Sequence, residues 1–215
     1  MQNAPEIDTL LGFGQIFTLL FVTLGPLKLL GPFVKLTHDM AASAMKKTAL
    51  LSFLIAVIAV LFGGFLGRAL LSNWQVSIPA MYLAGGIIFA LVGLRLVLEQ
   101  YETATGATPP PISAPGLLTA AMHVTFPSIV TPYGIAALVI MFANSPDAAR
   151  TQGVVLILLA VMALNLAAMF FARSIMRGVV LIGLQILGAV LGVLQVALAI
   201  EMILRALRGI GALHG

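Results

Sequence analysis

The sequence predicts an all-α polytopic membrane protein, and three observations lead there. Hydrophobic residues make up 61% of the 215 residues and charged residues only 8%, whereas soluble domains carry about 25% charged residues. The apolar residues form long runs separated by short polar stretches, and about 20 apolar residues suffice for a helix to cross a bilayer. Two of these runs are interrupted by paired prolines, and function is expected at these interruptions.

Six transmembrane helices are expected, one for each apolar run. They cover residues 9–36, 48–71, 79–99, 116–142, 152–171 and 179–207. A polar loop that holds Lys35, His38, Asp39, Lys46 and Lys47 is expected between the first two. Trp74 stands where an interfacial anchor is expected. The Asn144–Asp147 stretch is typical of a turn or a helix start.

The chain divides into two halves of similar pattern. Residues 1–100 are predicted to form a first three-helix repeat, residues 101–115 a proline-rich linker, and residues 116–215 a second repeat. At a shift of 102 residues, Val22-Thr23 falls on Val124-Thr125. Three spans per repeat is an odd number, so the second repeat must be inverted relative to the first. Inverted repeats are the plan of many secondary transporters.

The two interruptions are FVTLGPLKLLGPF (Phe21–Phe33) and HVTFPSIVTPYGI (His123–Ile135). Each begins with Val-Thr and then contains two prolines. Proline removes a backbone donor and clashes with the preceding turn, so helices 1 and 4 should be broken there. Broken backbone at membrane depth is tolerated only where it is buried in protein or lines a wet cavity. A matched pair of such segments in two halves of a chain predicts a transporter binding site.

The candidate substrate-binding residues lie mostly at these interruptions. They are Thr23, Gly25, Pro26, Lys28, Gly31, Pro32, Thr125, Pro127, Ser128, Thr131, Pro132, Gly134 and Asn165. Each hydroxyl either satisfies backbone freed by proline or lines a solute site. Lys28 either contacts a substrate carboxylate or the carbonyls of the break, or extends to the membrane surface. Asn165 either bonds a neighbouring helix or contacts substrate.

Two carboxylates are candidates for proton coupling, because intramembrane carboxylates often relay protons. They are Glu99 and Glu201. The simpler interpretation pairs them with Arg95 and Arg205, four residues away on the same helices. The third and sixth spans also carry glycines that let helices pack closely, within one chain or in a homo-oligomer. These glycines are Gly85, Gly86, Gly93, Gly183, Gly188 and Gly192.

Several classes of function are excluded or disfavoured. The chain has no cysteine, so it forms no disulfide or thiolate metal site. Its three histidines lie far apart and have no carboxylates at metal spacing, so neither a metal nor a cofactor is expected. Nucleic acid is not an expected partner, because the Lys and Arg residues are scattered at helix ends. A P-loop motif is absent, which disfavours an ATP-driven pump. The acidic N-terminus lacks the pattern of a signal peptide, so no cleavage is expected.

The distribution of Lys and Arg predicts that both termini lie outside the cytoplasm. The inner side would then receive Lys35, Lys46, Lys47, Arg173 and Arg177, with Arg95 close to it. The outer side would receive Arg68, Arg150, Arg205 and Arg208.

Three stretches carry a family resemblance: GPLKLLGPF (Gly25–Phe33), VSIPAMYLAGGIIFALVGLRLVL (Val76–Leu98) and FPSIVTPYGIAAL (Phe126–Leu138). Together they resemble the MarC family, also called the neutral amino acid transporter family, of the LysE-type transporter superfamily. The resemblance implies a six-span protein of the bacterial cytoplasmic (inner) membrane. It also implies transport of small neutral amino acids such as glycine and alanine, coupled to protons.

The chain departs from the family's usual motifs at both interruptions. The first motif usually reads Asn-Pro or Asp-Pro, but Gly25 precedes the proline here, and Lys28 is unusual. In the second motif, Thr131 and Tyr133 stand where glycines are usual. These departures lie in the expected site, and they bear on the substrate more than on the fold.

The leading hypothesis is a secondary transporter or exporter of a small polar solute, embedded in the lipid bilayer and driven by protons. One alternative is a non-transporting membrane scaffold or regulator, which explains the hydrophobicity but not the paired interruptions. The other alternative is an intramembrane enzyme. That would need a nucleophile and a base, and the candidate pair close in sequence is Ser128 with His123. No catalytic role is therefore expected.

Overall fold

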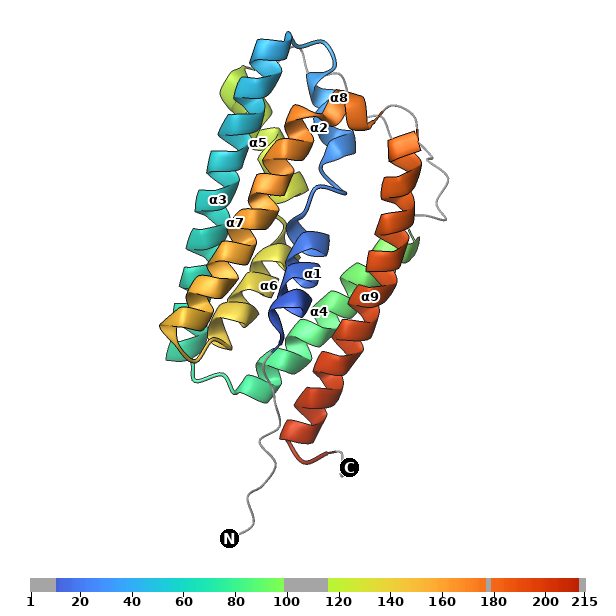
Figure 1. Ribbon diagram of the computed structural model, residues 1–215. Helices are drawn as coiled ribbons and strands as arrows, with labels where there is room; N and C mark the ends of the chain where they lie inside the picture. The colour runs from blue at the N-terminus through green and yellow to red at the C-terminus, as the bar shows by residue number, and fades with distance from the viewer. Residues whose placement is uncertain (1–10, 99–115, 177–178, 213–215) are drawn as a thin grey trace.

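The structure is a computed structural model that describes residues 11–98, 116–176 and 179–212, and its regular elements are helices. They are α1 (Phe13–Leu24), α2 (Leu30–Thr37), α3 (Ala42–Asn73), α4 (Ile78–Leu98), α5 (Leu117–Val124), the π-helix η1 (Thr125–Ile129), α6 (Pro132–Ala143), α7 (Ala148–Phe170), α8 (Ala172–Ile175) and α9 (Val179–Gly209). The long helices lie roughly along one axis (Figure 1).

Among the described residues, four helices are long and apolar enough to cross a membrane. The candidate spans are Ala42–Asn73, Ile78–Arg95, Ala148–Phe170 and Ile186–Gly209. α1 and α6 are shorter apolar helices. Large apolar side chains such as Ile58, Phe62 and Leu156 are exposed on the outside of the bundle, where a lipid environment would cover them. The architecture is consistent with the expected polytopic membrane protein.

The first interruption separates α1 from α2. α1 ends at Leu24, and Gly25 follows in an extended conformation, with its N–H still bonded to the Phe21 carbonyl. A side chain at this glycine would overlap that carbonyl, so a residue without Cβ suits the sharp exit. The Pro26 carbonyl then accepts bonds that lead into α2. Pro32 lies in the first turn of α2, where the missing N–H is tolerated.

The second interruption has a different local form. α5 continues into the π-helix η1, inside which Phe126 has the non-helical angles φ −114° and ψ 122°. Val130 and Thr131 are extended, and α6 begins at Pro132. Proline at the first helical position is favoured because its fixed φ suits the helix and its missing N–H needs no partner. Both expected helix breaks are therefore present in the structure.

The two broken segments run in opposite directions. In Figure 1 the path from α1 to α2 rises, whereas the path from α5 to α6 descends. α1 packs against α7, while α5 packs against α3. α3 also packs against α7, and α4 lies along α9 as a pair beside the other helices.

Glycines allow the closest helix approaches. A Cβ at Gly64 of α3 would lie 2.6 Å from Leu138 of α6, and a Cβ at Gly86 of α4 would lie 2.6 Å from Ile203 of α9. The expected small-residue faces thus pack helices inside one chain. Gly183 differs, because it is exposed and no described atom lies within 4 Å of an added Cβ.

Some expected boundaries need correction. Lys46 and Lys47 lie in the first turns of α3, not in a loop, and Lys35 lies in α2. Alanine and methionine around the lysine pair favour helix, and both lysines reach solvent from it. The predicted linker, residues 101–115, lies outside the described residues. Asp147 caps α7 by accepting a bond from the Arg150 N–H at 2.6 Å, which confirms the expected helix start.

Candidate functional site

The two helix breaks contact each other through threonine and glycine. The hydroxyl of Thr131 donates to the Thr23 carbonyl at 3.3 Å and accepts from the Gly134 N–H at 3.1 Å. The same hydroxyl therefore both caps α6 and bonds the end of α1. A side chain at Gly134 would overlap Leu24, so this glycine lets the first turn of α6 approach the last turn of α1.

Asn165 ties the first break to α7. Its Nδ2 donates to the Leu24 carbonyl at 2.6 Å, where the end of α1 leaves that carbonyl without a partner in its own helix. The residue is buried, and its Oδ1 has no partner among the described residues. The interhelical role that the sequence predicted is present, and one buried acceptor stays open for a donor.

Lys28 and Tyr133 form a second contact between the two breaks. The ammonium of Lys28 donates to the Tyr133 hydroxyl at 2.7 Å and lies 4.4 Å from the centroid of its ring. The contact is thus both a hydrogen bond and a cation–π interaction. Lys28 is half-buried. Of the options that the sequence left open, the structure shows a lysine that faces protein and bonds a phenol.

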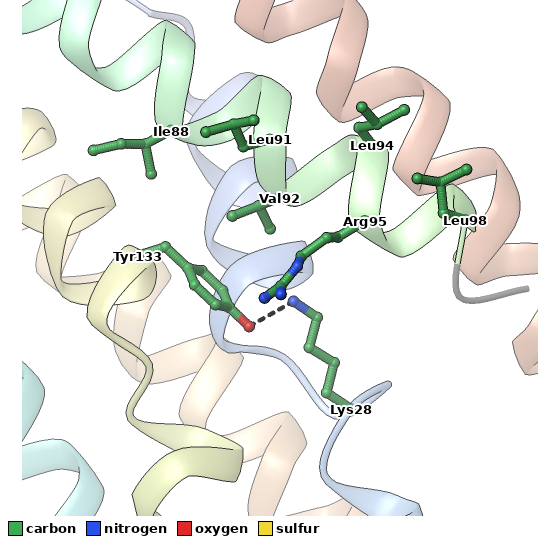
Figure 2. A pocket seen from close by; sticks show the side chains of 8 residues that line it. All are labelled: Lys28, Ile88, Leu91, Val92, Leu94, Arg95, Leu98 and Tyr133. Atoms are coloured by element: carbon green, nitrogen blue, oxygen red, sulfur yellow. Dashed lines mark hydrogen bonds between the residues drawn. The ribbon is translucent and has the colours of Figure 1, made fainter. Parts of the chain in front are cut away.

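A cavity of about 430 Å³ opens beside this pair. Its volume falls in the range of about 300–1,000 Å³ that is usual for small-molecule sites. The lining residues are Lys28, Ile88, Leu91, Val92, Leu94, Arg95, Leu98 and Tyr133. Figure 2 shows the Lys28 ammonium and the Arg95 guanidinium extending toward the Tyr133 hydroxyl, with apolar side chains of α4 around them. The site is an apolar cavity with one polar corner.

The hydroxyls of Thr23 and Thr125 serve the backbone instead of the cavity. Thr23 donates to the Leu19 carbonyl at 2.7 Å, and Thr125 to the Ala121 carbonyl at 2.8 Å. Ser52 of α3 adds a bond to the Ala121 carbonyl at 3.2 Å. Of the two uses that the sequence left open for these hydroxyls, the structure shows the structural one.

The remaining predicted residues surround the breaks at different depths. Gly25 is buried, Pro26, Gly31 and Ser128 are half-buried, Pro32 and Pro132 are exposed, and the side chain of Pro127 lies outside the description. The structure thus brings Lys28 to the cavity and Thr131, Gly134 and Asn165 to the contact between the breaks. Their role in binding a substrate stays a prediction.

The carboxylates proposed for proton coupling lie away from the breaks or outside the description. Glu201 accepts from the Nε of Arg205 at 3.0 Å, which is the expected pair within one helix. Glu99 lies outside the described residues. The imidazole Nδ1 of His123 lies 2.9 Å from the Thr119 carbonyl, and the residue is exposed. This contact gives no support to a catalytic pair with Ser128.

Of the residues that line the cavity, sequence reasoning predicted only Lys28, and the polar residues that it missed are Tyr133 and Arg95. Both were noticed for other reasons, Tyr133 as a departure from a family motif and Arg95 as one half of an ion pair. The signal that could have found Tyr133 was the combination of two unusual residues. A lysine in one interruption and a tyrosine in the other, each unusual for the motif, could have been predicted to contact each other.

The family follows from a match across nearly the whole chain. The family model described as "MarC family integral membrane protein" matches residues 10–211. The chain belongs to the MarC family. Two MarC-type relatives are similar at low identity. UPF0056 membrane protein MJ1677 of Methanocaldococcus jannaschii is 24% identical over 200 residues, which cover 93% of this chain and 96% of the relative.

The second relative is the UPF0056 inner membrane protein MarC of Salmonella arizonae. It is 22% identical over 210 residues, which cover 92% of this chain and 95% of the relative. No solved structure matches this chain significantly. The chain is therefore a divergent MarC-family protein, and the two side chains that depart from the family's usual motifs, Lys28 and Tyr133, contact each other.

Proposed function

We propose that this MarC-family protein is a secondary transporter of a small solute, built from six spans in two inverted three-helix repeats. The first repeat comprises α1 to α4, and the second comprises α5 to α9. The contact of α1 with α7 and of α5 with α3 supports the repeat, because a two-fold axis would exchange these pairs. The opposite directions of the two broken segments support the inversion.

The observation that carries the proposal is the meeting of the two breaks beside a cavity. Residues 105 positions apart in the sequence, Lys28 and Tyr133, bond there. Transporter sites of this kind lie between discontinuous helices near the bilayer midplane. Side chains of α4 line one side of the cavity, and Lys28 and Tyr133 of the two breaks lie on the other (Figure 2). α4 packs along α9 as a pair. Rocking of this pair against the remaining helices would open the site to one side of the membrane and then to the other.

We place the protein in the cytoplasmic membrane, in line with the printed name of the Salmonella arizonae relative. The start of α1 and the end of α9 lie at the same end of the bundle (Figure 1). The other end carries the α2–α3 connection and α8, with Lys35, Lys46, Lys47 and Arg173 near it. The positive-inside rule makes that end cytoplasmic, so both termini would lie outside.

The test is uptake into proteoliposomes, with and without an imposed pH gradient, against empty liposomes. The solutes are labelled glycine and alanine, which the family resemblance implies, and short organic acids. We expect gradient-stimulated uptake of at least one class. We also expect Thr131→Val to reduce it, and Thr37→Val to leave it intact. Thr37 is a matched control, because it is also buried and its hydroxyl bonds within its own helix, to the Phe33 carbonyl at 2.8 Å.

Uptake of no solute by the intact protein, under either condition, would contradict the proposal and would favour a scaffold or regulatory role. Equal loss in the two threonine variants would place the effect in folding and not at the breaks.

A further inference from the structure

Among the described residues that line the cavity, the charges do not balance. Lys28 and Arg95 both contribute cations, and among the described lining residues there is no carboxylate. The bond that Lys28 makes is to a neutral phenol. Lys28 is half-buried and Arg95 is exposed, so water screens part of their charge, but two neighbouring cations still attract an anion.

Arg95 differs from other arginines near the helix ends. The guanidinium of Arg173 donates to the carbonyls of Thr37 and Met40 at 2.7 and 2.8 Å, and that of Arg150 donates to the Leu11 carbonyl. Those arginines hold the ends of helices together. Arg95 has no hydrogen-bond or ion-pair partner within the described part of the chain, and its side chain lines the cavity instead.

We infer that the cavity binds an organic anion, in which one carboxylate or phosphate group is attached to an apolar body. The inference rests on the proposed transport site and names its substrate class. The planar guanidinium of Arg95 suits both oxygens of a carboxylate, and the Lys28 ammonium adds a point charge. The Tyr133 hydroxyl accepts from Lys28, which leaves its own proton for the anion.

The apolar body is held by α4. Ile88, Leu91, Val92, Leu94 and Leu98 line the cavity, and residues 88–98 extend over about 15 Å at 1.5 Å per residue. A short alkyl or aryl chain fits along this length. A zwitterionic amino acid fits worse, because its ammonium would meet two cations and no carboxylate in the described lining. The class therefore differs from the neutral amino acids that the family resemblance implies.

The test measures binding without transport. The full-length protein is placed in nanodiscs of phosphatidylcholine, and binding of radiolabelled octanoate is followed by equilibrium dialysis against empty nanodiscs. We expect saturable binding that unlabelled octanoate displaces. Octanol has the same body without the charge, and 2-aminooctanoate adds an ammonium. Both should compete at least tenfold more weakly than octanoate.

The variants Lys28→Met and Arg95→Gln should each weaken octanoate binding at least tenfold. Lys35→Met and Arg208→Gln are matched controls, because these exposed cations lie outside the cavity, and they should bind as the wild type does. Equal competition by octanol, equal loss in the control variants, unchanged binding in either cavity variant, or no saturable octanoate binding would each overturn the inference.

A second arm identifies where the anion comes from. Nanodiscs that contain phosphatidylglycerol should displace octanoate from the wild type if the anion is a lipid headgroup, and should leave binding unchanged if it is dissolved in water. Both results retain an anion site. Octanoate binding without transport of any solute would contradict only the proposed function. Transport of another solute without octanoate binding would contradict only the inference.

Discussion

The Lys28 ammonium lies 2.7 Å from the Tyr133 hydroxyl, and this bond joins two helix breaks that are 105 residues apart in the sequence. Both residues border the cavity. The bond ties the first break to the first turn of α6. An ammonium has three donors, so Lys28 keeps donors for a second acceptor beside the phenol.

A double-mutant cycle measures this bond. Tyr133→Phe removes the hydroxyl and keeps the ring, and Lys28→Met removes the charge. A hydrogen bond that involves a charged group contributes about 1.5–3 kcal/mol, and the partial exposure of Lys28 to water lowers this value. We expect a coupling of about 1 kcal/mol in the free energy of unfolding, measured by reversible denaturation in detergent. If the two single effects simply added, the contact would not form in solution.

Thr131→Val should destabilise the protein by about 1–2 kcal/mol. The substitution preserves shape but removes the cap of α6 and the bond to the Thr23 carbonyl, and loss of an N-cap alone costs about 1 kcal/mol. The free energy of unfolding checks this. Thr37→Val loses only one bond within α2 and should cost less. A larger effect at Thr37 would mean that Thr131 does not cap α6.

A comparison of Asn165→Leu with Gln195→Leu should separate an effect on stability from an effect on transport. Asn165→Leu leaves the Leu24 carbonyl buried without its donor, which costs about 1–3 kcal/mol. Gln195→Leu is the matched control, since Gln195 is equally buried and donates to the Phe89 carbonyl at 3.1 Å. We expect similar losses of unfolding free energy in both variants. Uptake in proteoliposomes should fall only in Asn165→Leu, because Gln195 bonds within the α4–α9 pair, which is proposed to move as one unit, and not to either break.

Uptake that stays at the wild-type rate in both variants would show that the first break tolerates the loss of its link to α7. Uptake that falls equally in both would show that transport follows stability alone.

The positions of the breaks could be predicted from the sequence, because proline acts locally. The rings at Pro26 and Pro132 determine where helices end and begin whatever surrounds them. The close packing of helices could be predicted from the glycines for a similar reason, since few other residues let two helices approach so closely. The exact ends of the helices were harder to predict. Lys46 and Lys47 extend to solvent from a helix as readily as from a loop.

The contents of the cavity could not be predicted in the same way. Which side chains meet there depends on how α4 is rotated about its axis and on where the two breaks pass each other. Arg95 lies near the end of an apolar helix, and its spacing from Glu99 offered a local ion pair as the simpler interpretation. The pairing of Lys28 with Tyr133 depends on the inverted packing of distant segments, which no local pattern encodes.

The contact between α3 and α6 gives the last prediction. A Cβ at Gly64 would lie 2.6 Å from Leu138 and 3.0 Å from Phe142, and both of these side chains are fully buried. Neither can move without disturbing the core, so Gly64→Ala should destabilise the protein, because overpacking costs about 1–3 kcal/mol. That exceeds the gain of about 0.5–1 kcal/mol that alanine brings to a helix interior.

Gly183→Ala provides the control, because that glycine lies in α9 with nothing within 4 Å of an added Cβ. It should stabilise the protein slightly through helix propensity alone. Denaturation in the same detergent measures both variants. A stabilising effect of the same size at Gly64 would mean that α6 does not approach α3 as the structure has it. The first turn of α6 would then be free to move away from the end of α1, and the contact between the two breaks would lose its support.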